Sequence, residues 1–177
     1  MCIRDRAIGV PQFHSQESRK YQRSVLMEAG EIHRQQEVLQ EQVGKLFPHL
    51  HDPKVKYTDA RKSSAKESLP AIAEKQKSVN ELLGALITKL DGIGEQLNDD
   101  ERTAAIQAAA QAAKQQSVTA AESLEGDDPY ATLAAQDAAV AKVSELLGTL
   151  KNHHIACLLY TSPSPRDRTR SRMPSSA

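Results

Sequence analysis

The feature that most constrains this chain is the spacing of its apolar residues, which recur every three or four positions in four separate segments. That spacing places side chains on one face of an α-helix, whereas a half-buried strand would alternate every second position. No segment shows a competing strand pattern. The sequence therefore predicts an all-α fold, an antiparallel up-down helical bundle of three to four amphipathic helices, in a chain that we expect to be a truncated fragment.

Four apolar stripes define the predicted helices, which cover about residues 15–47, 69–97, 99–125 and 129–152. The first stripe is interrupted by polar Gln36 and otherwise consists of Val25, Ala29, Ile32, Leu39, Val43 and Leu46. The second consists of Ile72, Val79, Leu83, Leu86, Leu90, Ile93 and Leu97, and is widened by Leu82 and Ile87. The third consists of Ile106, Ala110, Ala113, Ser117, Ala120 and Leu124. The fourth consists of Leu133, Gln136, Val140, Val143, Leu147 and Leu150.

Proline and capping residues predict where these helices begin and end. Pro48 cannot donate a backbone hydrogen bond and is expected to end the first helix, and Pro70 is expected to kink or break the chain near the start of the second. Asn98 and Glu101 fit a capping box at a turn, although one helix could also run through them. Residues 126–129 combine a terminal glycine with Asp-Pro at the next helix start. Short connections would make the last three helices antiparallel neighbours, whereas the first either completes a four-helix bundle or belongs to a preceding module.

The two ends of the chain are related to each other as DNA and not as protein. Residues 1–6, Met-Cys-Ile-Arg-Asp-Arg, can be encoded by ATGTGTATAAGAGACAG. The reverse complement of that DNA, read from its second base, encodes Cys-Leu-Leu-Tyr-Thr, which is the sequence of residues 157–161. Both ends resemble the translated mosaic end of transposase-based sequencing adapters, and residues 162–177 resemble the rest of such an adapter. The alternative is a basic, disordered tail rich in serine and proline.

The adapter resemblance implies a division of the chain into native and non-native parts. Residues 1–6 and 157–177 would be adapter-derived, and the second of these segments would be disordered. Residues 7–52 would hold the N-terminal helix and linker, and residues 53–156 the helical bundle. Functional residues are therefore expected between residues 7 and 156.

Setting the ends aside changes what the composition implies. The chain has 23 basic and 23 acidic residues; the ends carry six arginines and two aspartates, which leaves 17 basic and 21 acidic residues, a net charge of −4, in residues 7–156. A mildly acidic segment is not typical of nucleic-acid binding, and no apolar run reaches the length of a membrane span. Cys2 and Cys157 lie in the ends, so disulfides and thiol chemistry are not expected. We expect a cytoplasmic protein.

Two groups of residues suggest chemistry, and each has a simpler interpretation. Ser63 and Lys66 have the Ser-x-x-Lys spacing of some acylating enzymes, but the companion motifs of that class are missing. His49 and His51, and the pair at 153–154, could bind a metal if they converged, but solvated loop histidines explain them equally simply. We therefore expect no catalytic residues.

The acidic pairs at 99–101 and 127–128 suggest a divalent cation site, or simply helix capping with a favourable dipole interaction. We prefer the capping interpretation. A di-metal bundle would need Glu-x-x-His pairs, and no histidine in residues 7–156 has a glutamate three positions before it. Glycine-rich phosphate loops are also absent from the sequence. We expect neither a cofactor nor a metal site.

Residues 133–147 carry the one pattern that suggests a partner. They resemble the vinculin-binding helices of talin rods, in which leucine, paired alanines, Val-Ala, valine and leucine recur at helical intervals. The matching positions are Leu133, Val140, Ala141 and Leu147. The departures are Gln136, Asp137, Ser144 and Gly148. The alanine-rich stretch 99–125 also resembles such rod bundles.

The talin-like resemblance implies a non-catalytic interaction or scaffold module of the cytoskeletal-adaptor kind. Such a module would bind a protein partner or self-associate through the helix seams. Two alternatives stay open: an oligomerising coiled-coil segment, or a helical accessory region of a larger enzyme. A lipid-surface role fits less well, because the stretch 99–125 is alanine-rich and residues 7–156 are acidic.

Overall fold

The computed structural model describes residues 12–97 and 100–161, and within these ranges the chain forms α-helices and no strand. The helices are α1 (Gln12–Leu46), α2 (Asp59–Leu97), α3 (Asp100–Ser123) and α4 (Pro129–Thr161), with a short 3-10 helix, η1 (Pro48–Leu50), after α1. The predicted all-α fold is confirmed.

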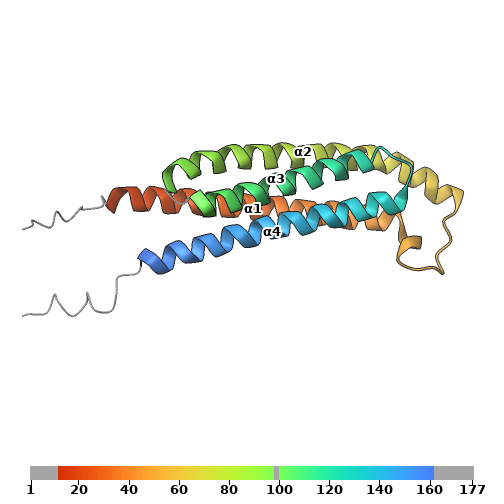
Figure 1. Cartoon of the computed structure of the whole chain (residues 1–177). Helices are drawn as coiled ribbons and strands as arrows, with labels where there is room; N and C mark the ends of the chain where they lie inside the picture. The colour runs from red at the N-terminus through yellow and green to blue at the C-terminus, as the bar shows by residue number, and fades with distance from the viewer. Residues whose placement is uncertain (1–11, 98–99, 162–177) are drawn as a thin grey trace, which may run out of the picture.

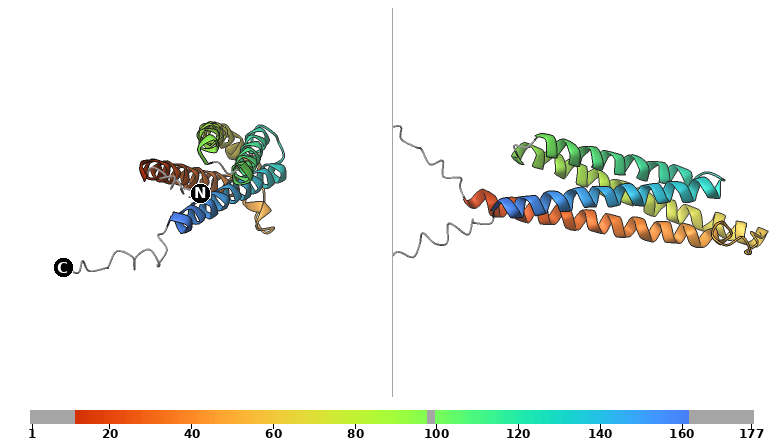
Figure 2. Two further views of the ribbon diagram at one scale, coloured as in Figure 1. Left: turned by 60° about the vertical axis from the view of Figure 1, so that its left-hand side comes forward. Right: turned by 60° about the horizontal axis from the view of Figure 1, so that its bottom comes forward.

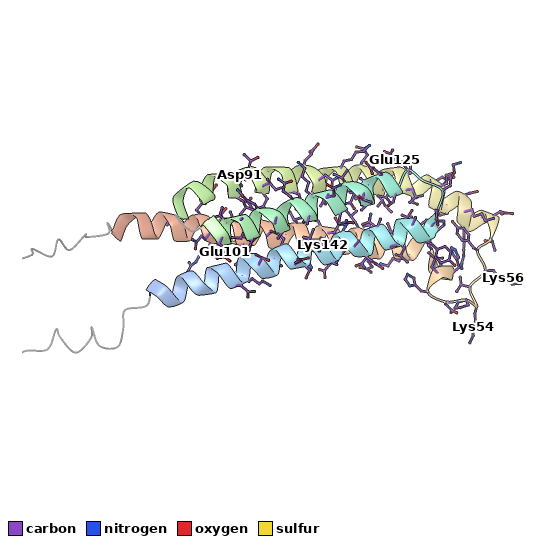
Figure 3. The ribbon with its side chains drawn as sticks, in the orientation of Figure 1. Lys54, Lys56, Asp91, Glu101, Glu125 and Lys142 are labelled. Carbon is purple, nitrogen blue, oxygen red and sulfur yellow. The ribbon has the colours of Figure 1, made fainter. Side chains whose placement is uncertain are left out.

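The four α-helices form one elongated up-down bundle (Figure 1). Each helix packs against two neighbours: α1 and α3 each contact both α2 and α4. The first helix therefore completes a four-helix bundle with the other three. Its N-terminal end lies at the same end of the bundle as the C-terminal end of α4, and both run beyond the α2–α3 turn (Figures 1 and 2). At the opposite end, Lys54 and Lys56 project from the segment that joins α1 to α2 (Figure 3).

The core lies along the bundle axis and differs in character between helices. α2 contributes large side chains, and Leu83 and Leu86 are among the most buried in the molecule. α3 contributes mainly small ones, of which Ala110 and Ala113 are fully buried. Alanine lets neighbouring backbones approach closely but removes little apolar area from water. No helix in the described ranges is apolar over a length that could cross a membrane.

Pro70 corrects one prediction, because α2 begins at Asp59 and continues through the proline without a break. Proline cannot donate a hydrogen bond to the carbonyl of Lys66, and both residues lie on the exposed side of α2. Ala65 and Ile72 are buried on either side of Pro70. Packing of this inner face holds the helix continuous across a residue that would end an isolated helix.

Other helix boundaries also differ from those predicted. α4 does not end near residue 152 but continues to Thr161, so it includes residues 157–161 of the segment expected to be disordered. α1 begins at Gln12, and α3 ends at Ser123. The predicted cap at Asn98 and the remaining residues of both end segments, 1–6 and 162–177, lie outside the described residues.

Candidate functional site

Helix α4 carries the candidate partner-binding residues, and a well-formed cap fixes its start. Asp128 Oδ1 accepts hydrogen bonds from the backbone N–H groups of Tyr130 (2.9 Å) and Ala131 (3.3 Å). Pro129, which has no N–H to satisfy, occupies the first helical position. Thr132 Oγ1 lies 2.9 Å from the carbonyl oxygens of both Ser123 and Asp128. The end of α3 and the start of α4 are thus tied together, and the acidic residue at this turn serves as a cap.

The structure places the four candidate residues of α4 at the edge of the core. Leu133, Val140 and Leu147 are half-buried, whereas Ala141 is exposed. Leu133 and Leu147 pack against the core cluster. The centre of the interface is filled by other residues of α4, namely Thr132, Gln136, Ala139, Val143, Leu146 and Leu150. The resemblance therefore selects a stripe that flanks the core-facing side of α4.

An open groove lies at the Leu133 end of this stripe, between α4 and α1. It has a volume of about 620 Å³ and is lined by Leu133 and Asp137 of α4 and by Gln40 and Gly44 of α1, among others. Gln40 Nε2 donates a hydrogen bond to Asp137 Oδ1 across it. Leu133 thus borders both the core and a groove open to solvent.

A layer of polar side chains crosses the interior of the bundle. It is made by Gln36 of α1, Gln76 and Asn80 of α2, Ser117 of α3 and Gln136 of α4, and all except the half-buried Asn80 are fully buried. Gln36 Nε2 donates to Gln76 Oε1 (3.1 Å) and to Gln136 Oε1 (2.8 Å). Gln76 Nε2 donates to Gln36 Oε1 (2.7 Å) and to Ser117 Oγ (2.8 Å). Ser117 Oγ donates in turn to Asn80 Oδ1.

This polar layer joins all four helices, and one buried amide nitrogen in it has no hydrogen-bond partner in the part of the chain that the structure describes. Gln36 is its hub, because it bonds to residues on both helices that flank α1. Gln136 Nε2 is buried and has no hydrogen-bond partner among the described residues. Buried amides are costly unless they are hydrogen-bonded. The hydrogen bonds of the layer therefore satisfy most of these buried polar atoms inside an otherwise apolar core.

Among the other sequence candidates, the two loop histidines have different surroundings, and the side chains at 99–100 and 153–154 lie outside what the structure describes. His49 stacks on Tyr57 with ring centroids 4.0 Å apart, while the His51 side chain lies next to Gly44. Ser63 and Lys66 are both exposed on the first turns of α2. Within the described residues, no group of three or more His, Cys, Asp or Glu side chains could hold a metal ion.

Two features of the interior were not predicted from the sequence. The predicted stripe of α2 does not include Gln76, and the signal for it is the seven-residue gap between Ile72 and Val79. Phe47, His49 and Tyr57 form an aromatic cluster at the α1–α2 connection. Their spacing in the sequence gives no sign that the chain folds back on itself at this point.

Comparison of the chain with protein-family models, with curated proteins and with solved structures finds no match in any of the three.

Proposed function

We propose that this chain is a non-catalytic helical-bundle interaction module in which α4 is the partner-binding element, as in a cytoskeletal adaptor. The observation that supports this most is the position of Leu133, Val140 and Leu147, which form a half-buried apolar stripe on one side of α4. A partner with an apolar groove for an amphipathic helix would bind side chains that recur at this helical spacing. Ala141 is exposed next to it and is accessible in the closed bundle.

The packing of α4 is consistent with displacement by a partner. Among its fully buried positions, Thr132 and Gln136 are polar and Ala139 is small, while Val143 and Leu146 are the larger apolar residues. The facing helix α3 contributes the small residues Ala110 and Ala113. Since hydrophobic stabilisation follows the apolar area removed from water, this interface gains less than one built from leucine. A partner groove lined by larger apolar residues could compete for α4.

The proposal rests on residues 7–156 and gives the adapter-like ends no part in binding. It also requires that the chain acts as a single copy. Light scattering on the full chain separates this from the oligomerising alternative, because a mass that rises with concentration would favour self-association through the helix seams instead.

A binding titration with a paired control tests the proposal. Fluorescently labelled full chain is titrated with a vinculin head domain, and we expect a saturable signal. Ala141→Glu places a charge next to the stripe at an exposed position, and should weaken binding at least tenfold, or about 1.4 kcal/mol. Ala108→Glu makes the same change at an exposed alanine of α3 and should leave the affinity unchanged. Lack of saturable binding by the parent chain, or equal affinity of both variants, would overturn the assignment of α4.

A further inference from the structure

We infer that the polar layer of Gln36, Gln76, Asn80, Ser117 and Gln136 fixes the axial register of α1 against the other three helices. The connections between the helices differ in length, and a shorter connection restricts the axial position of a helix relative to its neighbour more strongly. Residues 124–128 form a tight turn between α3 and α4 with successive backbone hydrogen bonds, and only residues 98–99 separate α2 from α3. Such short connections restrict the sliding of neighbouring helices along their axes. α1, by contrast, is joined to α2 through residues 47–58.

That connection is long enough to let α1 slide. A shift of one heptad moves a helix by about 10 Å along its axis, whereas each extended residue spans up to about 3.5 Å. The apolar stripe of α1 would not resist such a shift by itself. Its buried positions repeat every seven residues, as Val25, Ile32 and Leu39 on one row and as Ala29 and Val43 on either side of Gln36 on the other.

Gln36 is what distinguishes one register of α1 from the next. In the observed register it pairs with Gln76 and Gln136. A shift by seven residues would put Ala29 or Val43 at this level. Gln76 Oε1 and Gln136 Oε1 would then lose the Gln36 amide that donates to them, although Gln76 Nε2 would keep Ser117 Oγ, and a buried polar atom without a partner is costly. A single polar position in a helix seam selects register for the same reason in coiled coils.

Stability does not explain the layer, since a well-packed apolar replacement of buried polar groups is often neutral or stabilising. The layer also leaves Gln136 Nε2 unpaired. The layer connects all four helices although one of its donors has no partner among the described residues. We therefore attribute it to the choice of one packing arrangement over others. This inference is independent of whether α4 binds a partner.

Distance measurement between two spin labels tests the inference on the full chain. The labels are placed at Met27→Cys on α1 and Ala134→Cys on α4, both exposed positions, in a chain with Cys2→Ser and Cys157→Ser. The parent should give a single distance. The combined variant Gln36→Leu, Gln76→Leu, Ser117→Ala and Gln136→Leu should give additional distances that correspond to axial shifts of about 10 Å.

Two further variants complete the experiment. Gln36→Met removes only the hub, and its additional distances carry the test if the combined variant does not fold. Gln115→Met makes the same change at an exposed glutamine of α3 and should keep the parent's single distance. The inference is overturned if folded Gln36→Met, or the folded combined variant, shows only the parent's distance.

Discussion

At the residue scale, an ion pair across the α1–α2 interface complements the apolar stripe. Lys89 Nζ lies 2.7 Å from both carboxylate oxygens of Glu28, and Ser24 Oγ donates to the same carboxylate (3.1 Å). The hydrogen bond from Lys89 is the main reason that the pKa of Glu28 lies below its ordinary value of 4.5; partial burial opposes this shift and Ser24 adds to it. Tyr21 also donates to the Lys89 carbonyl oxygen (3.2 Å).

The Glu28–Lys89 pair predicts a pH dependence of stability. Because the carboxyl pKa is lower in the folded than in the unfolded chain, the pair stabilises the fold above about pH 4.5, and this contribution is lost as the pH falls through the lowered pKa. Titration of the Glu28 carboxyl carbon by NMR should show a midpoint below 4.5. Lys89→Met should move the midpoint up, whereas Lys77→Met, away from this pair, should not. A midpoint of 4.5 or higher in the parent would contradict the pairing.

At the scale of elements, α2 and α3 each depart in one way from an ordinary leucine-rich amphipathic helix. In α2 the irregularity is Pro70, an exposed proline inside a long helix. In α3 it is the alanine-rich inner face, which includes Ala110, Ala113 and Ala120 at full burial. The first reduces backbone hydrogen bonding, and the second sets how closely α3 approaches its neighbours.

Replacing Pro70 with alanine should stabilise α2. The variant restores a backbone donor for the Lys66 carbonyl and removes the steric conflict of the ring, so the free energy of unfolding should rise by about 1–3 kcal/mol. Urea unfolding followed by circular dichroism measures it. Ser63→Ala, at an exposed position of the same helix, serves as the control and should change the value by less than about 0.5 kcal/mol. An unchanged or lower value for Pro70→Ala would mean that α2 has adapted fully to the proline.

Enlarging the inner face of α3 should have the opposite effect. Ala113 has no exposed surface, and Ala113→Leu would push α3 away from its neighbours, at a cost of about 1–3 kcal/mol. Ala108→Leu adds the same side chain at an exposed position and should be nearly neutral. Equal unfolding midpoints for the two variants in urea would show that α3 is not packed as closely as described.

The sequence predicted the helices, the end of α2 at Leu97 and the start of α4 at Pro129, but it began α2 too late and ended α4 too early. On α4 it also assigned Leu133, Val140 and Leu147 to the inner face, where the structure buries Thr132, Ala139 and Leu146. Periodicity found Val79, Leu83 and Leu86 because a helix face repeats regularly. It failed at Pro70, where tertiary packing overrides a local preference, and at Gln76, where a polar residue occupies a core position. The gap in the stripe marks the position of Gln76, but no local pattern shows which polar residues of the other helices it bonds to.

At the scale of the whole molecule, the position of α1 is the feature that the sequence left open. The connection over residues 47–58 is compatible with a separate module or with a bundle, because its length does not fix the direction of what precedes it. The structure shows α1 packed against both α2 and α4. The groove beside Leu133 also depends on this, since α1 supplies its other wall. The candidate site and the polar layer therefore both depend on closure of the bundle by α1.

A double-mutant cycle between Gln36 and Gln136 measures that closure most directly, because these side chains lie 100 positions apart and meet only if α1 packs against α4. Urea unfolding of the parent, Gln36→Met, Gln136→Met and the double variant gives the coupling free energy. We predict that the double variant loses less stability than the sum of the single variants, with a coupling of about 0.5–3 kcal/mol. The control pair Gln36→Met and Gln115→Met should be additive. Additive effects for Gln36 and Gln136 as well would contradict the closed bundle described here.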